Sequence, residues 1–212
     1  MEEIMLQMSE ALQKGQAPAV KELSEKALEE GFTAKQILDG GLMHGMGIVG
    51  EKFKRNEVFV PEVLIAARAM NAGIDVIKPL LMESGVKAAG KVVIGTVKGD
   101  LHDIGKNLVK IMMEGKGLEI IDLGADVSAE QFLTAAKENN ADIIACSALL
   151  TTTMTYMQEI VNAFEEDGYR DNVTIMVGGA PVTQNFCDTI GADIYSADAA
   201  SAADEALKVL AS

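Results

Sequence analysis

Asp100 and His102 are the two residues of this chain whose types and spacing best suit metal chemistry. They lie two positions apart where the chain should leave a strand, and alternation in extended chain puts both side chains on the same side. A carboxylate that holds one imidazole nitrogen fixes the tautomer and leaves the other nitrogen free to bind a metal. The pattern therefore predicts a metal-binding histidine, although so short a pattern also fits a solvated loop histidine.

A metal held entirely by protein side chains does not suit this sequence. Zinc sites use three or four protein ligands, whereas His102 has no second Cys, His or carboxylate cluster beside it. His44 is expected at a helix end or on the surface, and Cys146 and Cys187 are expected to be buried free thiols. A metal already enclosed by a macrocycle needs only one protein ligand, so a macrocycle-bound metal is the better interpretation.

Common nucleotide-binding motifs are missing from the same loop, which reads T-V-K-G-D-L-H-D-I-G. It lacks the G-x-G-x-x-G spacing of dinucleotide-binding sites. It also lacks a phosphate-binding loop, because Asn107 follows Gly105 and Lys106 where that motif requires Ser or Thr. Nicotinamide, flavin and ATP are therefore disfavoured, while Gly105 still offers a place where a ligand could approach the backbone closely.

Small residues follow two later strands. Ser147, Ala148 and Leu149 come after the third expected strand, and Gly178 and Gly179 come after the fourth. In a doubly wound sheet, ligands lie beyond the carboxyl ends of the strands, so these loops should share one edge. They could leave a slot for an elongated, nucleotide-like tail. Ordinary turn chemistry remains the alternative for each loop taken alone.

A change in hydrophobic period along the sequence predicts the helices and strands that position these loops. After residue 90, strand-like runs alternate with helical stretches, which predicts a parallel five-stranded sheet with helices on both faces, in the doubly wound α/β class. Ser128 and Gln131 should form a capping box at one helix start. The expected strands are 92–97, 118–123, 142–145, 173–177 and 193–195, and the expected helices are 106–114, 129–139, 154–166, 182–190 and 200–211.

The first part of the chain has only helical spacing. Gly31 should end one helix, Thr33 should cap the next and Pro61 should lie in the first turn of the last. Four helices joined by short turns predict a small bundle. The small, polar segment 83–90 is the expected linker, which places a helical domain at 1–88 and an α/β domain at 89–212.

The composition limits the possible partners and locations. With 212 residues, 49% of them hydrophobic, the chain has enough apolar side chains for a core. Its formal net charge of −14 would repel nucleic acid and anionic membranes, so neither is an expected partner. The N-terminus lacks the basic region and apolar stretch of an export signal, and no apolar run approaches the ~20 residues that span a bilayer. A cytoplasmic protein is expected.

The ordered motifs D-L-H-D-I-G, S-A-L-L-T and G-G resemble the cobalamin-binding domain shared by methionine synthase, corrinoid methyl-transfer proteins and several mutases. The segments E-K-F-K-R-N-E-V-F-V-P-E-V and A-A-R-A-M resemble the helical cap of the methyl-transferring branch. Together the two resemblances cover nearly the whole chain. They imply a helical cap domain at 1–88 followed by a Rossmann-like cobalamin-binding domain at 89–212.

The resemblance also implies roles for individual residues. His102 would be the lower axial ligand of the cobalt, replacing the dimethylbenzimidazole of the cofactor, and Asp100 would hold His102. Thr153 would extend this relay at a position where methionine synthase has Ser. The implied cofactor-binding set is Asp100, His102, Asp103, Gly105, Ser147, Leu149, Thr151, Thr153, Gly178 and Gly179, with Phe53 and Val60 covering the methyl face from the cap.

The function that the resemblance implies is methyl carriage without catalysis by this chain. A substrate-specific methyltransferase would methylate the Co(I) form, and methyl-Co(III) would pass the group to a second methyltransferase acting on tetrahydrofolate or coenzyme M. A reductive activase is a further expected partner, and methylamines, quaternary amines, methanol and methoxyaromatics are all possible donors. A small subunit of a cobalamin-dependent mutase and a corrinoid sensor are the alternatives, although a sensor needs an output region that this acidic sequence does not offer.

Overall fold

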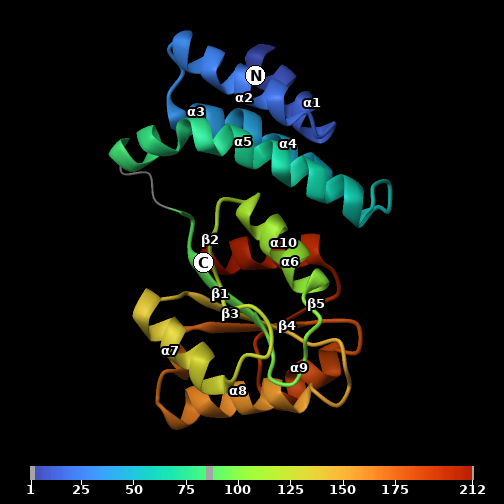
Figure 1. The fold of residues 1–212 in the computed structure, drawn as a ribbon. Helices are drawn as coiled ribbons and strands as arrows, with labels where there is room; N and C mark the ends of the chain where they lie inside the picture. The colour runs from blue at the N-terminus through green and yellow to red at the C-terminus, as the bar shows by residue number, and fades with distance from the viewer. Residues whose placement is uncertain (1–2, 85–87, 212) are drawn as a thin grey trace. The chain divides into compact units, whose positions relative to one another are not determined.

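The computed structural model describes residues 3–84 and 88–211 and divides into two compact units (Figure 1). One unit is formed by the chain before Ala88 together with Gly115–Gly117, and the other by Ala88–Glu114 and Leu118 onward. Residues 85–87 of the predicted linker lie outside the described residues. In the described part of the chain, no helix is both long and apolar enough to cross a membrane.

Among the described residues of the first unit, all regular secondary structure is helical, as predicted. Thr33 is a helix N-cap, also as predicted, since its hydroxyl accepts the Gln36 N–H at 3.2 Å; the Gln36 side chain in turn accepts the Thr33 N–H at 2.9 Å. Pro61 is the second residue of the last helix, again as predicted. The helical elements are α1 (Glu3–Gln13), α2 (Ala17–Glu29), α3 (Ala34–Ile37), the π-helical segment η1 (Leu38–Met43), α4 (His44–Lys54) and α5 (Val60–Ser84).

The segments α3, η1 and α4 follow one another without a break, so the four predicted helices correspond to α1, α2, this composite helix and α5. The π-helical turn in its middle was not predicted. It lies where α1 packs closely, because a Cβ on Gly41 would lie 2.5 Å from Met8 Sδ and one on Gly45 would lie 3.1 Å from Ser9 Cα. A side chain at either glycine would force Met8 or the backbone of α1 to shift.

The second unit is a five-stranded parallel sheet in the order β2-β1-β3-β4-β5. Helices α6 and α10 lie on one face, and α7, α8 and α9 lie on the other (Figure 1). The strands are β1 (Lys91–Thr96), β2 (Glu119–Asp122), β3 (Ile143–Ser147), β4 (Thr174–Gly178) and β5 (Ile194–Ser196). The helices are α6 (Ile104–Glu114), α7 (Ala129–Asn139), α8 (Thr155–Glu166), α9 (Gln184–Ile190) and α10 (Ala199–Leu210), with a 3-10 turn at Arg170–Asn172.

The strand order reverses between β1 and β3, and this fixes where a ligand fits. The chain leaves β1 toward α6 on one face and leaves β3 toward α8 on the other, so the two loops diverge at the carboxyl edge of the sheet. In open α/β sheets the crevice at such a switch point is the usual ligand site. The loop after β1 carries Asp100 and His102, and the loop after β3 runs from Ala148 to Met154.

Candidate functional site

Asp100 and His102 meet as the two-residue spacing predicts. The Asp100 Oδ1 atom lies 2.7 Å from His102 Nδ1 and also accepts the backbone N–H of His102 at 3.1 Å. The Asp100 side chain is fully buried, whereas the imidazole is 51% exposed. Because the carboxylate engages Nδ1, Nε2 is the ring nitrogen left to bind a metal.

The second carboxylate oxygen of Asp100 is held by the loop after β3. Oδ2 accepts the backbone N–H groups of Leu149 at 2.8 Å and Leu150 at 3.2 Å, and the Thr153 hydroxyl at 2.8 Å. The same hydroxyl lies 2.9 Å from the Leu150 carbonyl oxygen. Its single proton serves only one acceptor, and the ionised carboxylate is the stronger. The predicted relay from Thr153 through Asp100 to His102 is thus present as a chain of hydrogen bonds.

These contacts decide the charge state of Asp100. Burial by itself would raise the pKa of this carboxyl, but the hydrogen bonds from the Leu149 N–H, from the ring and backbone of His102 and from the Thr153 hydroxyl outweigh burial. Together they hold the pKa of Asp100 well below its ordinary value. A negative charge therefore lies behind the imidazole and favours the tautomer in which Nδ1–H donates a hydrogen bond to Asp100.

The short loop after β1 is held by hydrogen bonds within the loop and to the end of β1. The hydroxyl of Thr96, the last residue of β1, donates to the His102 carbonyl oxygen at 3.1 Å. The Asp100 N–H donates to the Val97 carbonyl oxygen at 3.1 Å, which closes a turn through Gly99, whose φ is +78°. A side chain is strained in that left-handed conformation, so Gly99 suits the position.

Large apolar side chains lie unexpectedly exposed next to this pair. Leu101 is 75% exposed and Ile104 is 74% exposed, and Leu149 and Leu150 are 45% and 40% exposed. We call Leu101, Ile104, Leu149 and Leu150 the apolar shelf. Grouped exposed apolar side chains are typical of binding sites, and apolar side chains beside an imidazole suit a metal-bearing macrocycle. Of the four, only Leu149 was predicted, because burial in a packed core is the usual reason for apolar residues in a sequence.

The predicted slot residues lie at neighbouring strand ends. Ser147 and Gly178 are register partners, and the Ala148 N–H donates to the Gly178 carbonyl oxygen at 3.2 Å. Gly179 has a φ of +133°, and a Cβ there would lie 1.9 Å from the Ala148 oxygen. The two loops therefore pass each other only because residue 179 is glycine. Thr151 is exposed in the same loop as Leu149.

Two further observations bear on a ligand in this region. A Cβ on Gly105 would meet nothing within 4 Å, so packing inside the protein does not require glycine there and the space beside it is open. Ser196, the register partner of Gly178 at the end of β5, has a buried hydroxyl without a hydrogen-bond partner. Sequence reasoning missed Ser196, whose only signal was its place in a loop after a strand. Asp103 is exposed, and its carbonyl oxygen accepts the Asn107 N–H at 2.8 Å in the first turn of α6.

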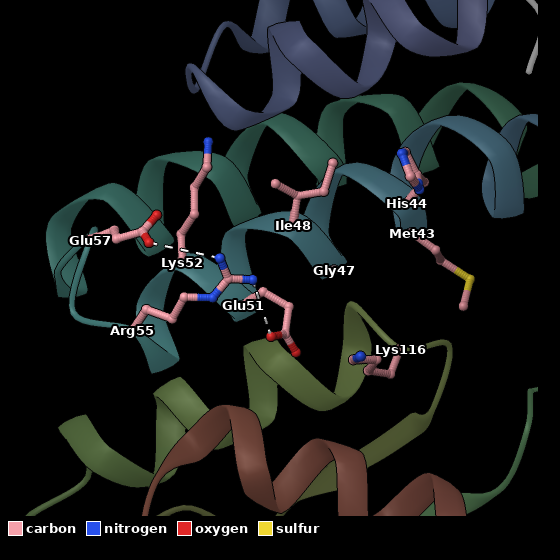
Figure 2. Close-up of a pocket in the computed structure, with 9 residues that line it drawn as sticks. All are labelled: Met43, His44, Gly47, Ile48, Glu51, Lys52, Arg55, Glu57 and Lys116. Atoms are coloured by element: carbon pink, nitrogen blue, oxygen red, sulfur yellow. Dashed lines mark ion pairs between the residues drawn. The ribbon is translucent and has the colours of Figure 1, made fainter.

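The remaining predicted residues lie on the helical unit. Phe53, in the last turn of α4, and Val60, the first residue of α5, are each partly exposed. Their predicted cover over a methyl group stays a prediction. Figure 2 shows a pocket lined by His44 of α4 and by Arg55, the residue that follows α4; Arg55 pairs with Glu51 at 3.8 Å and Glu57 at 3.9 Å. His44 is the first residue of α4 but lies inside the composite helix, so the predicted helix-end position is wrong; its side chain is partly exposed.

A metal site built from protein ligands alone has no candidate among the described residues, because no group of three or more His, Cys, Asp or Glu side chains converges. Cys146 and Cys187 are free and buried, as predicted, and burial raises the pKa of both thiols. Neither is therefore a ready thiolate ligand. The single half-exposed imidazole, backed by a buried carboxylate and flanked by the apolar shelf, fits a metal that arrives in its own macrocycle.

Comparison with known proteins gives the same answer along the whole chain. A B12 binding domain model matches residues 90–208, and a second B12 binding domain model matches residues 6–78. The chain is 43% identical to trimethylamine corrinoid protein 1 of Methanosarcina acetivorans over 211 residues, which cover 99% of this chain and 98% of the relative. It is 41% identical to dimethylamine corrinoid protein 1 of the same organism over 211 residues, 99% of each chain.

The fold has a counterpart among solved structures. A chain of the methanol:cobalamin methyltransferase complex from Methanosarcina barkeri superposes with a TM-score of 0.89 at 32% identity. The match covers 99% of the present chain and 80% of that one. Both the five-stranded parallel sheet and the preceding helices are therefore shared with a protein of a cobalamin-dependent complex.

Proposed function

This chain belongs to the family of cobalamin-binding corrinoid proteins, and on that premise we propose that it carries methyl groups between two methyltransferases. When bound, the corrinoid supplies a cobalt that accepts a methyl group from a donor and later gives it up. The observation that carries the proposal is the half-exposed imidazole of His102, held through Nδ1 by the buried Asp100 and surrounded by the apolar shelf.

In this proposal the residues around His102 hold the ring in one orientation. His102 would offer Nε2 to the cobalt, while Asp100 accepts a hydrogen bond from Nδ1–H and so keeps the tautomer that leaves Nε2 free. Thr153 and the backbone N–H groups of Leu149 and Leu150 hold the carboxylate in place. The apolar shelf would contact the macrocycle and exclude water from it.

The rest of the cofactor would extend into the slot at the strand ends. Ser147, Leu149, Gly178 and Gly179 line it in this proposal, with the exposed Asp103, Gly105 and Thr151 at its entrance. The buried hydroxyl of Ser196 supports a polar ligand there, because a buried polar group without a partner is costly unless a ligand satisfies it. Phe53 and Val60 would shield the methyl-bearing face.

The partners follow from what the chain does not supply. We propose a substrate-specific methyltransferase that delivers the methyl group and a second enzyme that moves it to tetrahydrofolate or coenzyme M, both in the cytoplasm. A reductive activase would restore carrier that has lost an electron. Because the relatives described above are named for trimethylamine and dimethylamine, methylated amines are the first donor class to test.

The first test uses the fact that the chain has only two histidines, His44 and His102. Protein labelled with ¹⁵N-histidine, loaded with cobalamin and held as Co(II), should show in its electron paramagnetic resonance spectrum the superhyperfine pattern of an axial ¹⁵N nucleus, which differs from that of the unlabelled base of the cofactor. The substitution His102→Ala should abolish that pattern. His44→Ala is the matched control and should leave it unchanged. A ¹⁵N axial pattern that survives His102→Ala would contradict the assignment.

A further inference from the structure

Asp126 lies in the loop between β2 and α7 and contacts the loop after β1 twice. Its Oδ1 atom accepts the Gly99 N–H at 2.7 Å, and its own N–H donates to the Asp100 carbonyl oxygen at 3.1 Å. The next residue, Val127, forms an isolated parallel bridge with Val97, and its N–H donates to the Thr96 carbonyl oxygen at 3.0 Å. The loop that bears Asp100 is thus fastened from a neighbouring element.

The two contacts of Asp126 lie on either side of the peptide bond between Gly99 and Asp100. One fixes the N–H of Gly99 and the other fixes the carbonyl oxygen of Asp100, so the backbone on both sides of the Asp100 Cα is held. Gly99 needs such restraint, because glycine in the left-handed region at φ +78° is free to adopt many other conformations. The direction of the Asp100 carboxylate, and hence of the ring it holds, depends on this backbone.

Asp126 has the features of a residue kept for these contacts. Its side chain is exposed and adds nothing to the apolar core, yet its backbone adopts the left-handed region with φ 58°. That region is uncommon for residues other than glycine and is best tolerated by Asn and Asp. An exposed residue in a disfavoured conformation, with its side chain turned to one backbone N–H, indicates a specific requirement at this position.

We propose that Asp126 is a positioning residue that aligns Asp100 with His102, and so sets how well the His102 ring is oriented for its ligand. The expected effect of Asp126 on cobalamin binding rests on the proposed function. Its expected effect on the His102 ring in the protein without cofactor does not. Asp126 itself touches neither the cobalt nor the methyl group in this account. It acts through the backbone of Gly99 and Asp100.

Comparison of three proteins distinguishes the contribution of the Asp126 side chain from that of its backbone conformation. Asp126→Gly removes the acceptor without straining the left-handed conformation, so a loss cannot come from strain at this position. Asp126→Asn keeps both an oxygen acceptor for the Gly99 N–H and a residue type that tolerates this conformation, and it serves as the rescue variant. Wild type completes the set.

The protein without cofactor gives the first measurement. In Asp126→Gly, hydrogen exchange of the Gly99 amide should be about tenfold faster, as the loss of one hydrogen bond to a charged group predicts. The ring nitrogen signals of His102 should shift away from the pattern of a single Nδ1–H tautomer, while those of His44 stay in place as an internal reference. Asp126→Asn should resemble wild type in both measurements.

The protein loaded with hydroxocobalamin and reduced to Co(II) gives the second measurement. Asp126→Gly should bind cobalamin about tenfold more weakly and show a reduced fraction of axial imidazole signal, and Asp126→Asn should restore both to within about twofold of wild type. Unchanged His102 ring signals in Asp126→Gly would overturn the inference, as would a defect of equal size in Asp126→Asn. If wild type binds cobalamin without an axial imidazole, the proposed function fails, while the measurements without cofactor still decide the role of Asp126.

Discussion

Five hydrogen-bond donors converge on the carboxylate of Asp100: the ring and backbone of His102, two backbone N–H groups of the loop after β3, and the hydroxyl of Thr153. A buried charge is stable only when it is paired in this way. The donors that keep Asp100 ionised also hold its carboxylate in place. They therefore determine both the negative charge and the position of the oxygen to which His102 Nδ1 donates.

This arrangement predicts a pH dependence of stability. Because the pKa of Asp100 is lowered on folding, its charge stabilises the native state above the ordinary carboxyl pKa of about 4, and that stabilisation is lost as the pH falls below this value. Asp100→Asn should be less stable than wild type near neutral pH by on the order of 2 kcal/mol. The difference should shrink as the pH is lowered from about 5 toward 2.

Urea unfolding of both proteins at several pH values measures this directly. Asp103→Asn is the matched control, because Asp103 is an exposed carboxylate three positions along the same loop. Its free energy of unfolding should stay within about 0.5 kcal/mol of wild type, as is usual for a surface substitution. A difference between wild type and Asp100→Asn that stays constant from neutral to acid pH would contradict the linkage.

At the scale of the elements, the strands could be predicted closely because a parallel sheet covered on both faces produces continuous apolar runs. Val92, Val93 and Ile94 are buried in β1 for this reason. The start of α9 was predicted less well. The apolar residue Val182 extends the helical pattern backward and is indeed buried, but the helix begins at Gln184, where the Thr183 hydroxyl accepts the Phe186 N–H. Periodicity cannot distinguish a buried loop residue from the first turn of a helix.

The site was predictable where it depends on local spacing and not where it depends on topology. The D-x-H spacing was enough to predict the contact between Asp100 and His102. The backbone donors of Leu149 and Leu150 were not predictable, because they reach Asp100 only through the pairing of β1 with β3. The same holds for Asp126, which reaches Gly99 from the loop after β2, and for Ser196 at the end of β5.

The apolar shelf supports a prediction at this scale. Leu101→Gln should leave the free energy of unfolding within about 0.5 kcal/mol of wild type, because the side chain is 75% exposed. Cobalamin should bind about tenfold more weakly, because binding would bury this apolar surface. Isothermal titration of the cofactor-free protein with cobalamin measures the affinity.

Leu64→Gln is the matched control for the apolar shelf. Leu64 is 47% exposed but lies on α5 of the helical unit, outside the shelf. Leu64→Gln should leave the free energy of unfolding and the affinity for cobalamin close to those of wild type. Equal affinities for wild type and Leu101→Gln would show that the macrocycle does not contact the shelf.

At the scale of the whole molecule, the chain combines an all-helical unit and an α/β unit, each with its own buried apolar residues. The change of hydrophobic period in the sequence predicts this division.

Near His102, Asp100 is fully engaged by its five donors and stays ionised, so it is not available to protonate a leaving amine or alcohol. A positioned acid of that kind contributes about 10²–10⁴-fold to a rate, and in our proposal the partner methyltransferases supply it.

The proposal therefore predicts that the chain alone does not react with its natural donors. Loaded protein reduced to Co(I) and mixed with trimethylamine, dimethylamine or methanol should keep its Co(I) absorption spectrum until a methyltransferase for that donor is added. Iodomethane is the control, because its leaving group needs no protonation and it should methylate the same sample without a partner. Saturable consumption of a natural donor by this chain alone would contradict the carrier role, since the residues around His102 would then have to include the missing acid.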